Sequence, residues 1–165
     1  MRQRRLNLTD PPDKKSQTVA PEPLVHLFGD KPGVLVVDDD HMVRVMLQLG
    51  LERNGFEVLL ASNGREAIEL FQTHRQAIAV VLLDVRMPGF DGVQTLDSLR
   101  ELDREVSACF MSGDTGAYEP DELLQRGAAH VIAKPFQLDE LANVLGLLAS
   151  RAPAESYGGV CQTEP

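Results

Sequence analysis

Residues 79–92, which read AVVLLDVRMPGFDG, decide the fold expected for this chain of 165 residues. An unbroken apolar run ends at Asp84, and a Met-Pro-Gly sequence stands shortly after it. This pattern indicates a strand that is buried on both faces and stopped by a turn. Asp84 is therefore predicted at the carboxyl end of a strand, where open α/β sheets gather side chains from several loops into one crevice. A single acid at such a position more often caps the next helix, so Asp84 alone identifies no site.

Three further predicted strands also run into polar residues, and these strands cover residues 33–37, 106–111 and 128–133. The polar residues that follow them are Asp38-Asp39-Asp40, Ser112 and Lys134. Asp40 is expected to cap the first helix. Four strand ends thus carry clustered acids, a single acid, a hydroxyl and an ammonium. This combination indicates a functional site rather than a set of helix caps.

Strand and helix patterns alternate five times between residues 32 and 150. The predicted strands cover 33–37, 56–61, 79–84, 106–111 and 128–133, and the predicted helices cover 41–54, 63–75, 91–102, 119–125 and 137–149. Gly55 is expected just after the end of the first helix, and Asn63 is expected to cap the second. Such regular alternation predicts an α/β domain with a parallel sheet, right-handed crossovers and helices on both faces.

The net charge of -9 is spread unevenly along the chain. Residues 32–149 hold nine Lys or Arg against nineteen Asp or Glu, so this part should repel phosphate backbones, and we expect no direct nucleic-acid binding. Residues 1–31 and 151–165 are polar and lack periodicity, which predicts a disordered extension and a disordered tail around one domain at 32–150.

The longest apolar run covers residues 77–83, far short of the ~20 residues that a membrane helix needs. The basic start of the chain is not followed by an apolar segment, so no secretory signal is recognised, and a cytoplasmic location is expected. Cys109 and Cys161 do not suggest a disulfide framework or a metal site.

The predicted strand-end residues suit phosphoryl transfer. If the fold brings Asp38, Asp39 and Asp84 together, their repulsion favours a bound cation, and Mg2+ prefers such oxygen ligands. Ca2+ is a weaker candidate because the chain has no EF-hand spacing. Asp84 would then be a nucleophile toward an activated phosphoryl group. Lys134 would offset negative charge on the transferring oxygens, and Ser112 would donate a hydrogen bond to one of them.

Four motifs occur in the order and at the spacing of a known family. They are VVDDD at 36–40, LLDVRMPGFDG at 82–92, MSG at 111–113 and KPF at 134–136. With them the segment from about 32 to 150 resembles the receiver domain of two-component response regulators, here of a single-domain type. The resemblance implies a flavodoxin-like (βα)5 fold, a doubly wound parallel sheet with strand order 2-1-3-4-5.

The resemblance also implies a role for each matching residue. Asp84 matches the phosphoacceptor, Asp38 and Asp39 match the acidic pair that holds Mg2+, and the main-chain carbonyl of Arg86 matches a further metal ligand. Ser112 matches the switch hydroxyl and Lys134 the family lysine. Pro135 matches a residue whose preceding peptide bond is often cis.

Two positions differ from the family pattern or vary within it. The second switch residue is usually Tyr or Phe, and here it is Val131, which has no ring to swing inward. Arg86 and Asp114 match positions that tune the lifetime of the phosphoryl group, and their opposite charges are predicted to pair across the mouth of the pocket. Such a pair would slow the entry of water.

The first helix has two apolar stripes, of which only one can face the sheet. They are Met42-Val45-Met46-Leu49 and Val43-Leu47-Leu51. The other stripe is a candidate docking surface for a phosphodonor helix. In the last helix, Val144 and Leu147 flank a core stripe made by Leu138, Leu141, Leu145 and Leu148. This flank is where the family commonly dimerises.

These features lead to a first hypothesis and two alternatives. The first is a phosphoacceptor, not an enzyme in the ordinary sense, that receives a phosphoryl group on Asp84 from a histidine kinase or a histidine phosphotransfer protein. It would signal to a protein target by conformational switching without an output domain of its own, and a homodimer could form on phosphorylation. The alternatives are a phosphorylation-independent interaction module and a Mg2+-dependent phosphohydrolase with an aspartyl intermediate. The second alternative normally needs an acid two residues after the nucleophile, where this chain has Arg86.

Overall fold

The computed structural model describes residues 31–113 and 118–151. The expected N-terminal extension, except Lys31, and the expected C-terminal tail, except Arg151, lie outside the described residues. Asp114 also lies outside them, and so does its predicted ion pair with Arg86.

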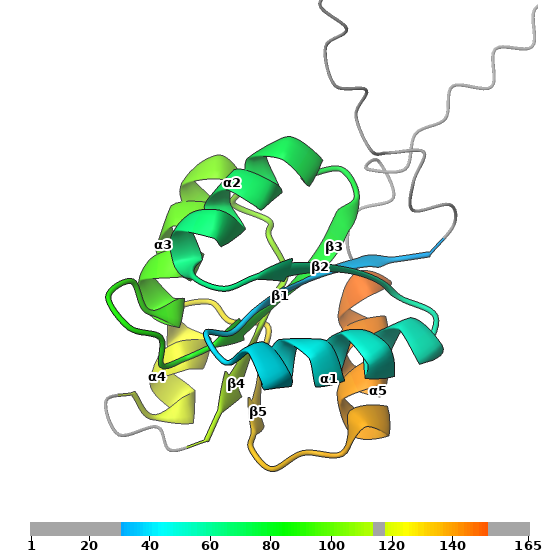
Figure 1. The fold of residues 1–165 in the computed structure, drawn as a ribbon. Coiled ribbons are helices and arrows are strands. Elements are labelled where there is room, and N and C mark those ends of the chain that lie inside the picture. The colour runs from blue at the N-terminus through cyan, green and yellow to red at the C-terminus, as the bar shows by residue number, and fades with distance from the viewer. Residues whose placement is uncertain (1–30, 114–117, 152–165) are drawn as a thin grey trace, which may run out of the picture.

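Five parallel strands form one sheet in the order β2-β1-β3-β4-β5, as Figure 1 shows. The strands are β1 (Gly33–Val37), β2 (Glu57–Ala61), β3 (Ile78–Asp84), β4 (Ala108–Ser112) and β5 (His130–Ala133). This order confirms the predicted flavodoxin-like sheet. β3 is the middle strand and is buried from Ala79 to Asp84, as its unbroken apolar sequence predicted.

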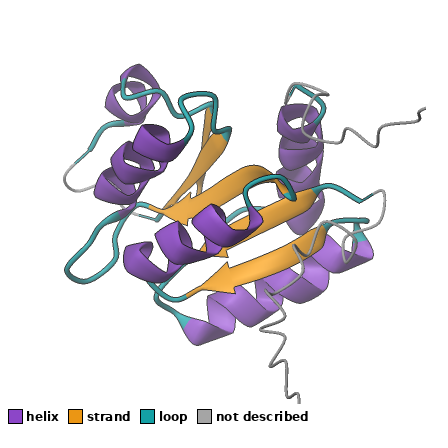
Figure 2. Ribbon diagram, turned by 90° about the horizontal axis from the view of Figure 1, so that it is seen from above, coloured by secondary structure: helices purple, strands orange, loops and turns teal. Residues whose placement is uncertain are grey.

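Four helices connect the strands, a fifth follows β5, and together they cover both faces of the sheet (Figure 2). They are α1 (His41–Arg53), α2 (Gly64–His74), α3 (Gly92–Leu102), α4 (Pro120–Gln125) and α5 (Leu138–Ala149). The sheet has a hydrophobic core on each face. On one face the strands pack against α2, α3 and α4, and on the other they pack against α1 and α5. Alternate residues of the strands contribute to the two cores: Leu35 and Val37 to the first, Val34 and Val36 to the second.

The helix ends follow the predicted caps. The Asp40 carboxylate accepts hydrogen bonds from the main-chain N–H groups of Met42 and Val43 at 2.7 and 3.4 Å, and Asn63 accepts one from Glu66 at 3.0 Å. Gly55 follows α1 with a φ of +88°, a conformation that favours glycine. These contacts confirm the roles predicted for Asp40, Asn63 and Gly55.

Two strands begin two residues later than predicted, β4 at Ala108 and β5 at His130. In the first case Val106 donates its N–H to the carbonyl of Asp103 at 3.2 Å. This bond closes a turn after α3, so the residue belongs to the turn although its side chain favours a strand.

Only one stripe of α1 faces the sheet, as expected. Leu47 and Leu51 are fully buried, whereas Met42, Met46 and Leu49 are 71%, 44% and 53% exposed. On α5 the predicted core residues Leu141, Leu145 and Leu148 are buried, and Leu147 is 66% exposed. Every helix within residues 31–113 and 118–151 is too short or too polar to span a lipid bilayer.

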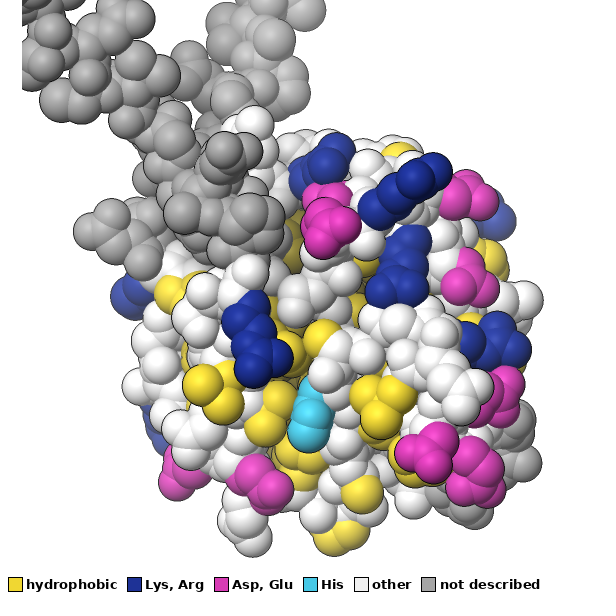
Figure 3. Space-filling model, turned by 180° about the vertical axis from the view of Figure 1, so that it is seen from behind, with side chains coloured by type: hydrophobic (Ala, Val, Ile, Leu, Met, Phe, Trp, Pro, Cys, Tyr) yellow, Lys and Arg dark blue, Asp and Glu magenta, His cyan; other side chains and the backbone are white. Residues whose placement is uncertain are grey.

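The surface charge is less uniform than the composition suggested. Lys and Arg side chains gather on the upper part of the face seen in Figure 3. Arg100, Arg104 and Arg151 line a shallow cavity of about 320 Å³. The Arg100 guanidinium donates to the carbonyls of Arg126 and Gly127 at 2.7 and 2.6 Å, which ties α3 to the end of α4.

Candidate functional site

The structure brings four of the predicted site residues to one edge of the sheet. Asp38 directly follows β1, Asp84 ends β3, Ser112 ends β4 and Lys134 directly follows β5. The strands are parallel, so their carboxyl ends meet at this edge.

Lys134 connects the two buried acids. Its Nζ lies 3.0 Å from Asp38 Oδ2 and 2.7 Å from Asp84 Oδ1. Asp38 is 2% exposed and Asp84 is 8% exposed, so both carboxylates are shielded from water. Buried carboxylates are stable only with a partner of opposite charge or with hydrogen bonds, and the ammonium group supplies both.

The second oxygen of each acid accepts a main-chain N–H. Asp84 Oδ2 accepts from Arg86 at 2.9 Å, and Asp38 Oδ1 accepts from Asp40 at 2.9 Å. Each carboxylate is therefore held at both oxygens, which fixes its orientation toward Lys134.

The backbone of Lys134 is also fixed. Its N–H donates to the Ser112 carbonyl at 2.6 Å, and the peptide bond between Lys134 and Pro135 is cis, as the family resemblance implied. The hydrogen bond joins the end of β4 to the segment that carries Lys134.

The charges of the site shift two pKa values. Burial raises the pKa of Asp84; the Lys134 ammonium opposes this shift, and the neighbouring Asp38 carboxylate adds to it. Burial lowers the pKa of Lys134, but its hydrogen bonds to Asp84 and Asp38 outweigh that effect, so the pKa of Lys134 is raised on balance. Lys134 is therefore charged at neutral pH, and Asp84 is more basic than an ordinary aspartate.

A small cavity adjoins Asp84. It has a volume of about 170 Å³ and is lined by Asp84, Val85, Arg86, Ser112, Gly113 and Lys134. The Ser112 hydroxyl oxygen is buried and has no hydrogen-bond partner in the described part of the chain. A buried polar group without a partner is uncommon and is typical of functional sites. The cavity therefore offers a carboxylate, an ammonium and a free hydroxyl to a small anionic group.

The predicted metal ligands are only partly brought together. Asp38 and Asp84 direct oxygens at one ammonium group, and such paired oxygen ligands fit Mg2+. Asp39 is exposed, and within residues 31–113 and 118–151 no group of three acidic, His or Cys side chains is arranged as a metal site. The Arg86 N–H contacts Asp84, so the main chain of Arg86 lies next to the acid.

Two further residues, which the sequence analysis did not identify, help to position the side chains of the site. Arg44 of α1 donates from Nη1 to the Asp38 carbonyl at 2.6 Å. Gly92 begins α3 so close to β3 that a Cβ atom there would collide with the Asp84 carbonyl. The glycine next to the helix cap Asp91 was a signal for the second contact, since glycine permits a close approach of two backbones. A single arginine in a helix gave no signal for the first.

Val131 packs against the core shared by α2, α3 and α4 and is half-buried. It has no ring, as the sequence already showed, so an inward swing of an aromatic side chain cannot occur at this position.

The sequence matches the family described as the response regulator receiver domain over residues 34–146. It is 40% identical over 121 residues to the transcriptional regulatory protein PrrA of Mycobacterium tuberculosis, a match that covers 73% of this chain and 51% of that protein. The chain thus spans about half the length of the curated relatives it matches.

Solved structures give the same result. The receiver domain of the Francisella response regulator 1452 is 30% identical with a TM-score of 0.67, and the match covers 73% of this chain and 98% of that one. The CheX–CheY–BeF3–Mg2+ complex of Borrelia burgdorferi contains a chain that is 27% identical with a TM-score of 0.65, covering 70% of this chain and 88% of that one. The chain belongs to the receiver domain family of two-component response regulators.

Proposed function

We propose that this receiver domain accepts a phosphoryl group on Asp84 in a Mg2+-dependent reaction and signals by a change of conformation. The observation that carries the proposal is the cavity beside Asp84, where Lys134 lies 2.7 Å from the acid and the Ser112 hydroxyl has no partner in the described residues. The phosphodonor is a histidine kinase or a histidine phosphotransfer protein, the donors typical of this family.

In the proposed reaction a carboxylate oxygen of Asp84 attacks the phosphorus atom while the bond to the donor nitrogen breaks. Burial raises the pKa of Asp84 in the metal-free protein, whereas a bound Mg2+ would favour the ionised carboxylate that makes the attack. Lys134 neutralises negative charge on the transferring oxygens, and Ser112 donates a hydrogen bond to one of them. Asp38, Asp39, Asp84 and the Arg86 carbonyl would hold Mg2+, whose two charges neutralise the phosphoryl oxygens further.

Support for Mg2+ comes from two observations. Asp38 and Asp84 already share one cation, the Lys134 ammonium, and the related Borrelia complex contains Mg2+. Asp39 is exposed, so its part in the metal site needs either a side-chain rotation or a contact through water.

The exposed stripe of α1 is the proposed docking surface for the phosphodonor. Met42, Met46 and Leu49 present apolar area to solvent, and α1 begins three residues after Asp38. A donor helix packed there would lie beside the acidic edge of the sheet. Dimerisation through the α5 flank at Leu147 after phosphorylation is part of the same proposal, as is a cytoplasmic location.

Signalling without an output domain of its own stays a prediction, because the match covers only about half the length of the curated relatives. So does the expectation that the domain is a phosphoacceptor rather than an enzyme. The downstream partner proposed is a protein, since the described domain carries many more acidic than basic residues.

Val131 favours one alternative, an interaction module that works without phosphorylation. Without a switch ring, a phosphoryl group on Asp84 would have to change the surface by another route. The phosphohydrolase alternative is disfavoured because Arg86, exposed and basic, stands where a second acid would be needed.

The test is intact mass spectrometry after incubation with acetyl phosphate and Mg2+, and again with a chelator. Wild type should gain the mass of one phosphoryl group only with Mg2+, and Asp84→Asn should gain none. Asp97→Asn, the same change at an exposed position of α3, should behave as wild type. If wild type gains no mass although it binds Mg2+, the interaction-module alternative is supported instead.

A further inference from the structure

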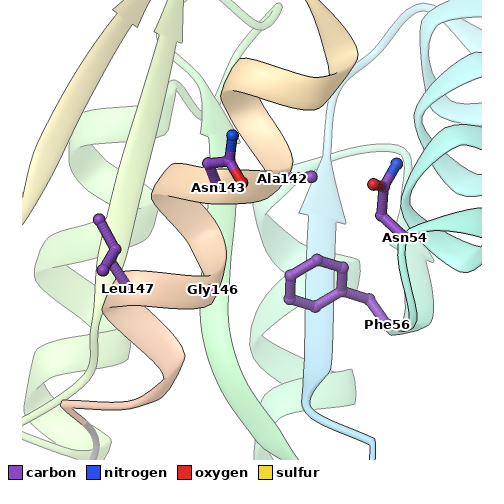
Figure 4. A pocket seen from close by; sticks show the side chains of 6 residues that line it. All are labelled: Asn54, Phe56, Ala142, Asn143, Gly146 and Leu147. Carbon is purple, nitrogen blue, oxygen red and sulfur yellow. The ribbon is translucent and has the colours of Figure 1, made fainter.

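A groove opens at the end of the sheet opposite Asp84. It has a volume of about 490 Å³ and is lined by Asn54, Phe56, Ala142, Asn143, Gly146 and Leu147. Figure 4 shows that it lies between α5 and the segment that joins α1 to β2. The proposed phosphoryl transfer to Asp84 does not use this groove, although Leu147 on its rim also belongs to the α5 flank proposed above for dimerisation.

The floor of the groove is apolar and its shape depends on small residues of α5. Phe56 is 5% exposed, and a Cβ atom at Gly146 would lie 4.0 Å from the Phe56 Cζ atom. Ala142 stands one turn before Gly146, so the helix approaches Phe56 with little side-chain bulk. The result is a hollow floored by an aromatic ring.

The rim combines amides with one exposed apolar side chain. Asn54 donates from Nδ2 to the Gly50 carbonyl at 2.9 Å, which holds this amide in place. Asn143 is exposed on α5, and Leu147 is 66% exposed on the same helix. An apolar floor with polar groups at the rim is typical of a site that binds apolar side chains and satisfies an accompanying backbone.

The chain enters the domain next to this groove. The Pro32 carbonyl accepts the Glu57 N–H at 3.1 Å, and the Lys31 Nζ lies 3.7 Å from Glu57 Oε1. Glu57 directly follows Phe56, so these two contacts anchor the entry point one residue from the floor of the groove.

The sequence just before that point contains an apolar cluster. Residues 24–28 read LVHLF, and only three residues separate Phe28 from the anchor at Pro32. An extended chain spans about 3.3 to 3.6 Å per residue, so Phe28 stays within roughly 15 Å of Pro32. In residues 152–165 the larger apolar side chains are scattered among polar residues and glycines, so this tail is a poorer candidate for the groove.

We propose that residues 24–28 of this chain dock in the groove between α5 and the α1–β2 connection, with Leu27 or Phe28 placed against Phe56 and Leu147. The short tether makes the contact intramolecular. A short linker supplies an effective concentration in the millimolar range, so an apolar contact is occupied most of the time if its dissociation constant lies below that range. The docked segment covers the exposed apolar surface of Leu147, so docking competes with the proposed dimerisation through the same flank of α5.

The experiment uses the full chain and a fluorescent reporter. The chain has no tryptophan, so Phe28→Trp introduces a single probe into the segment. We expect its emission to be shifted to shorter wavelength relative to the unfolded protein, and to be shielded from acrylamide. Adding Leu147→Asp should expose the probe, whereas adding Leu124→Asp, at a leucine that is 44% exposed on α4, should leave its emission unchanged.

Three outcomes would overturn the proposal. Emission at the wavelength of the unfolded chain would show that the segment is not docked, which would leave the groove open to another occupant such as the tail. A buried probe that is insensitive to Leu147→Asp would place the segment elsewhere. Burial that is lost on dilution would assign the groove to a second copy of the chain.

Discussion

Replacing Lys134 by Met removes the ammonium shared by two buried carboxylates. The Asp38 and Asp84 oxygens that it contacts, at 3.0 and 2.7 Å, are at most about 6 Å apart. At an effective dielectric constant of about 20, two like charges at that separation repel by about 3 kcal/mol. Removing one partner of a buried ion pair costs about 3 to 5 kcal/mol. The Lys134 side chain is 27% exposed, so we expect a loss near the lower end, about 3 kcal/mol of unfolding free energy.

The assay is urea unfolding at neutral pH, followed by far-UV circular dichroism, in the presence of a chelator and again with excess Mg2+. Mg2+ should restore more stability to the Lys134→Met variant than to wild type, because a divalent cation can take the place of the ammonium between two carboxylates. The control is Lys31→Met, the same chemical change at a surface pair. Lys31 lies 3.7 Å from Glu57 and its side chain is 55% exposed, so its loss should cost less than about 1 kcal/mol.

The loss of unfolding free energy in Lys134→Met should be largest near neutral pH and smaller at both higher and lower pH. The pKa of Lys134 is raised in the folded protein, so its contribution to stability is present below its ordinary pKa and is lost as the pH rises through the raised value. The deficit should also shrink in acid, where protonation of Asp84 removes the repulsion. Equal unfolding free energies for the Lys134 and Lys31 variants at neutral pH would refute this reasoning.

Three further outcomes are expected. Burial raises the pKa of Asp84, so its ionised form costs stability, and Asp84→Asn should raise the urea midpoint at neutral pH. The gain should shrink as the pH falls below the raised pKa and vanish below the ordinary pKa of an aspartate. Gly92→Ala should cost about 1 to 3 kcal/mol in the same assay because its Cβ would collide with β3, whereas Gly113→Ala, with its nearest atoms at 3.8 Å, should be nearly neutral. The buried Cys109 thiol has its pKa raised to about 12, so iodoacetamide should label it only in denaturant; peptide mass spectrometry would detect labelling of the folded protein, which would contradict this.

The sheet and the strand-end site could be predicted from local patterns. Asp84 follows an apolar run too long and too uniform for a half-exposed strand, and parallel strands deliver their carboxyl ends to one edge. The positions of Asp38, Ser112 and Lys134 then followed from where their own apolar runs stop. Helix caps such as Asp40 could be predicted because a capping side chain accepts hydrogen bonds only from residues two or three positions further along the chain.

Contacts between residues far apart in the sequence could not be predicted from local patterns. The link from Arg44 to the Asp38 carbonyl depends on the angle at which α1 leaves the sheet, and no spacing rule encodes that angle. Asp39 was grouped with its neighbour, yet successive residues at the end of a strand point in opposite directions, and Asp39 is exposed while Asp38 is buried. The groove at Gly146 requires a small residue to lie opposite Phe56, a pairing across ninety positions of sequence.

The two groups that meet at the centre of the site stand on strands with different places in the sheet. Asp84 ends β3, which has strands on both sides, whereas Lys134 follows β5, a four-residue strand at the edge of the sheet. Amide protons of a central strand exchange with solvent only when the whole domain unfolds, and those of a short edge strand exchange in smaller local openings. A local opening of β5 would therefore move the ammonium away while the aspartate stays in place, so the proposed phosphoryl transfer would stop without unfolding of the core.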